Sequence, residues 1–165
     1  MSILALMLAS TGAFAEPVIG EQVAHVQFKF DSSRLLPGVE ANLATVAKEA
    51  RANPDEHVVL GGFTDPIGSA PYNVGLAIRR AKAVESALVD QGVRPDQIVI
   101  SSFGEAGPRL AGYAPNRRVT ITLSDRPVGA AIDQTFAEGG TSVTWGRPMT
   151  TAEIEGSAGI PVASR

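Results

Sequence analysis

The sequence contains no cysteine. This absence excludes disulfide bonds, thiolate metal sites and a catalytic thiol within these 165 residues. Histidine is almost as scarce, because only His25 and His57 are present and they lie far apart in the sequence. Long apolar runs are missing as well, whereas a helix that crosses a bilayer of about 30 Å needs about 20 apolar residues. Redox, thiol and imidazole chemistry therefore have little to draw on, and we expect no transmembrane span in the mature chain.

Charge of one sign is not in excess either. The 14 Lys and Arg residues are scattered among 17 Asp and Glu residues, which gives a net charge of -3. A nucleic-acid partner is therefore not expected, since such partners require a basic patch. The 17 glycines and 11 prolines remain below the level of a low-complexity chain, and the length suits one ordinary domain.

The N-terminal residues have the pattern of an export signal. An apolar run from Ile3 to Leu8 precedes Ala13-Phe14-Ala15, which is the small-x-small pattern that a signal peptidase accepts. The sequence therefore predicts a signal peptide over residues 1–15, cleavage before Glu16, a linker over residues 16–23 and a periplasmic protein. The basic start of a signal peptide is missing, so the remnant of an uncleaved anchor stays open as an alternative.

Hydrophobic periodicity predicts four strands and two helices. The strands are expected at 24–30, 57–63, 98–103 and 119–123, and the helices at 37–52 and 70–91, in the order β-α-β-α-β-β. Two strand-helix-strand crossovers in about 100 residues indicate an α/β two-layer sandwich, with a small mixed sheet and both helices packed on one face.

The pattern dissolves after Ser124. We expect residues 24–124 to form the domain and residues 125–165 to be a Gly- and Pro-containing extension of unknown role, with one short strand from Ser142 to Trp145. Trp145 is interpreted either as a contact for a protein partner or as a residue that packs against the sheet.

One acid and one arginine stand out at the carboxyl edge of this predicted sheet. On a helical wheel, Arg80 and Asn73 lie on the inward face of the second helix, and Arg79 points away. A buried arginine needs a partner, and Asp65 is the available carboxylate. The two residues could form a structural ion pair. They could also bind a zwitterionic ligand, with Asp65 taking an ammonium group and Arg80 a carboxylate.

The chain resembles a known family through a series of ordered motifs. These motifs are Gly62-Phe63-Thr64-Asp65, Gly68, Asn73-x-x-Leu76, Arg80-Ala81-x-x-Val84, Phe103-Gly104-Glu105-x-x-Pro108 and Asn116-Arg117-Arg118-Val119. They are similar to the peptidoglycan-binding C-terminal domain of outer membrane protein A, which also occurs in the peptidoglycan-associated lipoprotein and in flagellar stator proteins. The resemblance runs from about Ala24 to Leu123.

The resemblance implies non-covalent binding of the peptidoglycan stem peptide in a Gram-negative envelope, through the free end of diaminopimelate. It assigns Asp65 and Arg80 to the ammonium and carboxylate groups and brings Asp31 and Arg117 near the pocket, where Arg117 is either a wall residue or a structural one. The zwitterion hypothesis drawn from the residues themselves gives neutral hydrogen bonds to Thr64 and Asn73. Pro66, Ala77 and Ser102 depart from the family pattern and bear on loop shape and ligand preference.

No cofactor, metal or enzyme activity is expected. The only loop acids near the predicted crevice are Asp31, Asp65 and Glu105, and Glu105 is assigned to a turn; no HExxH or Ser-His-Asp pattern is present. The alternative function is a wall-anchoring subunit of a secretion, conjugation or motor assembly, in which residues 125–165 contact an envelope protein complex.

Overall fold

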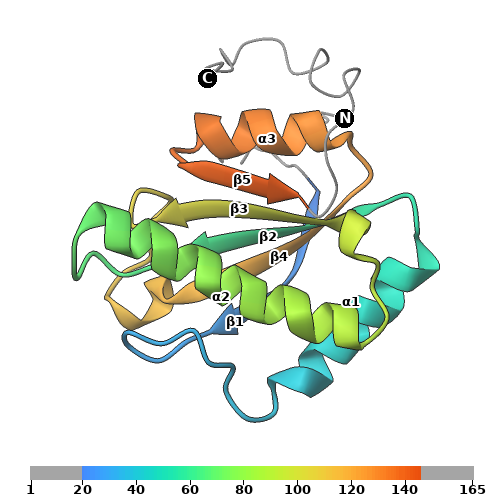
Figure 1. Ribbon diagram of the computed structural model, residues 1–165, viewed down its shortest axis with the longest axis horizontal. Coiled ribbons are helices and arrows are strands. Elements are labelled where there is room, and N and C mark those ends of the chain that lie inside the picture. Colours follow the sequence, from blue (N-terminus) through green and yellow to red (C-terminus); the bar gives the residue numbers. More distant parts are fainter. Residues whose placement is uncertain (1–19, 146–165) are drawn as a thin grey trace, which may run out of the picture.

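The structure, a computed structural model, describes residues 20–145 and is built around one five-stranded sheet (Figure 1). The strands lie in the order β1-β4-β2-β3-β5, with β2 and β3 parallel and the other neighbours antiparallel. They are β1 (Glu21–Gln27), β2 (His57–Phe63), β3 (Ile98–Gly104), β4 (Arg118–Ser124) and β5 (Ser142–Trp145). The predicted mixed sheet and α/β class are confirmed.

Two long helices cover one face of the sheet, as predicted (Figure 1). They are α1 (Val39–Ala52) and α2 (Ala70–Asp90), and short 3-10 helices η1 (Pro95–Gln97) and η2 (Ala114–Asn116) precede β3 and β4. Alternate residues of β2 and β3, such as Leu60 and Ile100, meet Leu43 and Val84 in the main core. Gly62 permits close packing of α2, because a Cβ at this position would lie 2.5 Å from the Ala77 carbonyl oxygen.

The segment after Ser124 contains a helix that the sequence analysis missed. Helix α3 (Val128–Ala137) packs on the opposite face of the sheet, against Val59 and Val99. Its buried residues have helical spacing, but Gly129 and the glycines after the helix hide the signal. Its buried residues are Val128, Ala131, Ile132 and Thr135.

The predicted short strand at Ser142 to Trp145 is present as β5, which pairs with β3. Trp145 packs at the edge of the α3 cluster, and its indole N–H donates to the Asp96 carbonyl at 2.8 Å. The interpretation of Trp145 as a packing residue therefore agrees with the structure, and the C-terminal segment as far as Trp145 belongs to the folded unit.

The first strand begins and ends earlier than predicted. It covers Glu21–Gln27 instead of residues 24–30, and Phe28 adds one further backbone hydrogen bond to the Arg117 carbonyl. Phe28 is buried, but Phe30, the last residue of the predicted strand, is 57% exposed and lies outside the strand. The chain turns away after Phe28, because the carbonyls of Lys29 and Ser32 bind Arg80 instead of a neighbouring strand.

The predicted signal peptide and its cleavage site, and residues 146–165, lie outside the described residues. Within residues 20–145, every helix is too short or too polar to cross a membrane.

Candidate functional site

The candidate site lies where the parallel strands β2 and β3 end at the same edge of the sheet. Just beyond these ends, the Thr64 amide donates to the Gly104 carbonyl at 2.7 Å, which holds the two following loops together. Asp65 comes next in the chain and is 96% buried, with a relative exposure of 4%. The topology therefore places a buried carboxylate at the carboxyl edge, where α/β sheets form ligand crevices.

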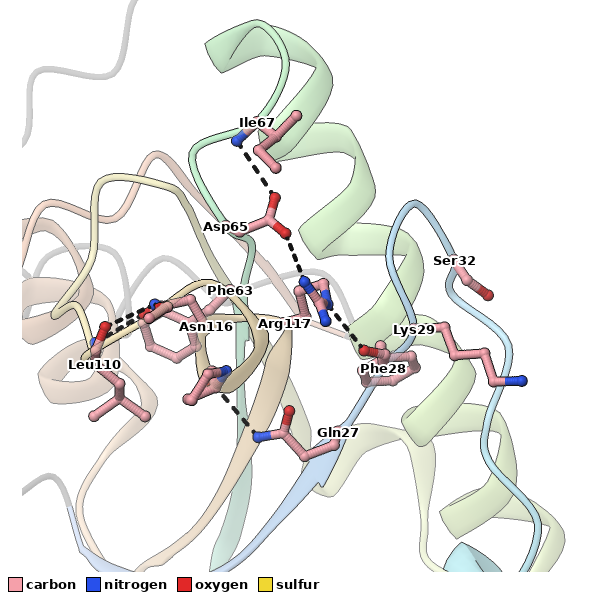
Figure 2. A network of polar contacts seen from close by, with 12 residues as sticks. Gln27, Phe28, Lys29, Ser32, Phe63, Asp65, Ile67, Leu110, Asn116 and Arg117 are labelled. Atoms are coloured by element: carbon pink, nitrogen blue, oxygen red, sulfur yellow. Dashed lines mark hydrogen bonds and ion pairs between the residues drawn. The ribbon is translucent and has the colours of Figure 1, made fainter.

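Asp65 pairs with Arg117, which comes from the turn before β4 (Figure 2). The Arg117 Nη1 lies 3.1 Å from Asp65 Oδ2, and the Arg117 Nε donates to the Phe28 carbonyl at 3.3 Å. The second oxygen of Asp65 accepts a hydrogen bond from the Ile67 amide at 3.3 Å. The Arg117 side chain is 20% exposed, against 6% for Asp65, so the pair lies at the border between interior and solvent.

Arg80 lies on the buried face of α2, as the helical wheel predicted, and it is fully buried. Its partners, however, are three backbone carbonyls: Nε donates to Ser32 at 2.9 Å, Nη1 to Phe63 at 3.0 Å and Nη2 to Lys29 at 3.1 Å. Of the two alternatives from the sequence, the direct Asp65–Arg80 ion pair is therefore not formed in this structure, since Arg117 pairs with the Asp65 carboxylate.

The charge of Arg80 still acts on the site. Burial lowers the pKa of Arg80 to about 10, while the nearby carboxylate of Asp65 raises it and Arg117 lowers it further. At this pKa the guanidinium stays protonated near neutral pH. The site thus holds two cationic groups, one fixed in the interior and one partly open to solvent.

Two neutral residues of the predicted site are buried with one side-chain atom unpaired among the described residues. Asn73 Nδ2 donates to Glu105 Oε2 at 2.5 Å, but Asn73 Oδ1 has no partner, and neither has Thr64 Oγ1. Glu105 thus fixes the Asn73 amide, a contact that the sequence analysis did not predict. The neighbouring Gly104 allows this close approach to α2, because its φ is 55° and a Cβ there would lie 3.2 Å from the Val74 nitrogen.

Asp31 stands beside the start of α2. Its backbone φ is 49°, in the left-handed region that non-glycine residues rarely adopt. Its carboxylate accepts a hydrogen bond from the Tyr72 hydroxyl, and this bond raises the pKa of Tyr72 above its ordinary value of 10.0. Arg79 is exposed and its guanidinium lies 5.5 Å from the Tyr72 ring centroid. Tyr72 therefore connects helix α2 to the loop that carries Asp31. The sequence analysis did not single out Tyr72.

A hollow of about 480 Å³ lies elsewhere, on the α3 face of the sheet. Its lining includes Gly61, Thr120, Gln134, Glu138 and Arg118, and none of the six predicted ligand residues. We place the candidate site at Asp65 because charged and hydrogen-bonding groups converge there. Within residues 20–145 no cluster of three acidic or histidine side chains could hold a metal ion.

Comparison with known proteins identifies the family of the chain. The family model described as "OmpA family" matches residues 27–121. A peptidoglycan-associated lipoprotein of Pseudomonas putida is 40% identical over 118 residues, which cover 68% of this chain and 70% of that protein. The peptidoglycan-binding protein ArfA of Mycobacterium tuberculosis is 36% identical over 104 residues, covering 60% of this chain but only 32% of ArfA.

Among solved structures, the peptidoglycan-associated lipoprotein of Burkholderia pseudomallei is similar to this chain with a TM-score of 0.59 and 31% sequence identity. The match covers 63% of this chain and 91% of that one. The likeness therefore includes nearly the whole of a solved protein that has the same kind of sheet and helices.

Proposed function

Because the chain belongs to the OmpA family, we propose that it binds peptidoglycan non-covalently through the pocket of Asp65, Arg117 and Arg80 and so associates with the cell wall. The names of two relatives support this proposal, since one is called peptidoglycan-associated and another peptidoglycan-binding. The observation that carries it is the Asp65–Arg117 ion pair at 3.1 Å, with a buried acid and a partly exposed base.

Such a pair suits a ligand that carries an ammonium and a carboxylate on neighbouring atoms. The ammonium would replace the Arg117 guanidinium at Asp65, and the released Arg117 would bind the ligand carboxylate. Arg80 adds a second positive charge behind this position, and its three carbonyl contacts hold it in place. We propose the free end of diaminopimelate in the stem peptide as this ligand.

The neutral residues would complete the pocket. Thr64 and Asn73 each keep a polar atom without a partner in the described part of the chain, and such atoms cost about 1–3 kcal/mol when buried. A ligand that supplies hydrogen bonds there would recover part of this cost. Asp31 would act less directly, by holding Tyr72 and thereby the start of α2.

The contacts predict weak binding at each site. A charge-assisted hydrogen bond contributes about 1.5–3 kcal/mol, and immobilising a flexible peptide costs several kcal/mol. The wall repeats its stem peptide many times, so a second attachment through a partner or another module would raise the total affinity. We propose a periplasmic, non-catalytic binding module, in which residues 1–15 serve as the export signal.

Sedimentation with purified sacculi tests the assignment. We expect Asp65→Asn and Arg117→Gln each to weaken binding by about 10- to 150-fold, which corresponds to the loss of one charge-assisted bond. Arg94→Gln is the matched control, because Arg94 is an exposed arginine that pairs only with Asp96 among the ion pairs of the described chain. Wild-type binding by folded Asp65→Asn and Arg117→Gln proteins would reject the site.

A further inference from the structure

Arg118, on the α3 face of the sheet, is a buried arginine without a counterion. Its relative exposure is 7%, and none of the ion pairs among the described residues includes it. Its Nη2 donates to the Pro108 carbonyl at 3.1 Å, whereas Nη1 has no hydrogen-bond partner within residues 20–145. Burial lowers the pKa of Arg118, and no carboxylate opposes this shift. An arginine stays protonated near neutral pH, so the α3 face holds a positive charge with an incomplete set of partners.

A stack of two phenylalanine rings holds this charge in place. The Arg118 guanidinium lies 4.0 Å from the centroid of the Phe63 ring. Phe63 stacks in turn on Phe103, with 4.7 Å between the ring centroids and 3° between the ring planes. The face of an aromatic ring attracts a cation, but it does not replace a hydrogen-bond acceptor in the plane of the guanidinium. The stack therefore positions the charge and leaves Nη1 without an acceptor.

The hollow of about 480 Å³ on the α3 face lies beside this arginine. Pockets that bind small molecules commonly have volumes of about 300–1,000 Å³. Arg118, Thr120 and Thr122 all line the hollow, because alternate residues of β4 point to the same face of the sheet. Phe63 and Phe103 line it as well. The lining thus combines a positive charge, two hydroxyl groups and an apolar aromatic wall.

The acids of the lining leave the guanidinium available. Among the described residues that line the hollow, Arg118 is the only cationic one, and Glu21 and Glu138 are the acidic ones. Neither acid contributes to the pKa of Arg118. Glu138 Oε1 already accepts a hydrogen bond from Gln134 Nε2 at 2.5 Å. An anion that entered the hollow would therefore find a cation that these two acids do not neutralise.

We propose that the hollow binds a small organic carboxylate, with its carboxylate group at Arg118 and its apolar body against the rings of Phe63 and Phe103. Nη1 is closed to solvent in this structure, so the side chain has to shift toward the hollow to donate to the ligand. A phosphate fits less well, because it carries a second negative charge. The lining offers no second cation, and α3 contributes residues of its C-terminal half, where the helix dipole is negative.

This binding site goes beyond the proposed function and does not depend on it, because it uses none of the six residues predicted for the candidate site. A titration followed by nuclear magnetic resonance tests the proposal with two probes of matched shape, the aromatic carboxylate cinnamate and its uncharged amide, cinnamamide. We expect millimolar cinnamate to shift the amide signals of Thr120 and Gln134. It should bind about 10- to 150-fold more tightly than cinnamamide, which corresponds to one charge-assisted hydrogen bond.

Two variants and one control assign the binding to the hollow. Arg118→Met should reduce the affinity for cinnamate to that for cinnamamide. Thr120→Leu should weaken both probes, because its larger side chain fills the space beside Gly61, where a Cβ would already lie 2.6 Å from the Thr120 hydroxyl. Arg94→Met is the matched control, since Arg94 is an exposed arginine outside the lining, and it should bind both probes as the wild type does.

Four results would each reject the site. The first is the absence of shifts at the lining residues in millimolar cinnamate, and the second is equal wild-type affinity for the two probes. The third is a folded Arg118→Met protein that still prefers cinnamate as strongly as the wild type. The fourth is a set of shifts confined to the amides of Asp65 and Arg117, which would place the anion at the candidate site instead. None of these results bears on the binding of sacculi, so the proposed function is tested separately.

Discussion

Within residues 20–145, each face of the central sheet buries one arginine, and the two are held in different ways. On the α2 face, Arg80 donates to three carbonyls from the loop after β1 and from the end of β2. On the α3 face, Arg118 donates to one carbonyl, that of Pro108 at 3.1 Å, and lies 4.0 Å from the Phe63 ring centroid. Its Nη1 has no hydrogen-bond partner in the described chain.

The two arginines also differ in what surrounds them, because Arg80 lies at the candidate site and Arg118 lines the hollow. Arg80 joins the segments that carry Asp31 and Asp65, so its hydrogen bonds hold the candidate site together. Arg118 lines the larger hollow on the other face, where Gly61 leaves room because a Cβ there would approach the Thr120 hydroxyl to 2.6 Å. The hollow on the α3 face therefore results from small residues, whereas the candidate site is defined by charged groups that lie close together.

The largest expected effect on the free energy of unfolding comes from replacing each of the two arginines by methionine in a separate variant. We expect Arg80→Met to lower the free energy of unfolding by about 3 to 5 kcal/mol, because it leaves three carbonyls without their donor and each unsatisfied buried group costs roughly 1–3 kcal/mol. Arg118→Met should cost about 1 kcal/mol, since it loses one hydrogen bond and a stacking contact but also removes an unpaired donor. Urea denaturation measures both values, and equal losses would contradict the comparison.

A second pair of variants compares the apolar packing on the two faces of the sheet. Leu43→Ala, in α1, should destabilise the protein by about 3 kcal/mol, because Leu43 is fully buried in the large core cluster. Ile132→Ala, in α3, should cost about 2 kcal/mol, the low end of the same range, since its cluster is small and 7% of Ile132 is exposed. Thermal unfolding of the two variants gives the order. If Ile132→Ala were the more damaging, α3 would contribute more to the core than its contacts indicate.

The smallest expected effect concerns the stability of the protein at alkaline pH. The pKa of Tyr72 is raised in the folded protein, mainly by the hydrogen bond to Asp31, so the folded state keeps the phenolic proton longer than the unfolded chain. Stability from this bond is therefore complete below pH 10.0 and is lost as the pH rises above it. Tyr72→Phe should flatten this alkaline decline, as followed by denaturation at several pH values. An unchanged pH dependence would show that the bond does not persist in solution.

Local periodicity was sufficient for most of the fold. Helix α2 was predicted at residues 70–91 and is observed at Ala70–Asp90, and β2 has the predicted bounds. The wheel of α2 also placed Asn73 and Arg80 inside and Arg79 outside, because a regular helix sets the direction of each side chain from its position alone.

Helix α3 and the end of β1 were harder to predict. Helix α3 has ten residues, begins after Pro127 and contains Gly129, so its local propensity is weak and its burial depends on Val59 and Val99. Strand β1 was predicted to continue to Phe30, but it ends at Gln27, and the carbonyls of Lys29 and Ser32 bind Arg80 instead of a neighbouring strand.

The sequence by itself determined the class of fold, the family motifs and the kinds of charged group that gather at the carboxyl edge of the sheet. Only the tertiary structure decided which groups pair: Asp65 meets Arg117 across 52 positions, and Arg80 is satisfied by carbonyls 17, 48 and 51 positions away. The physical reason is that periodicity sets where a side chain points within its own element. The choice of partner depends instead on how separate elements pack, and on the cost of leaving any buried charge without hydrogen bonds.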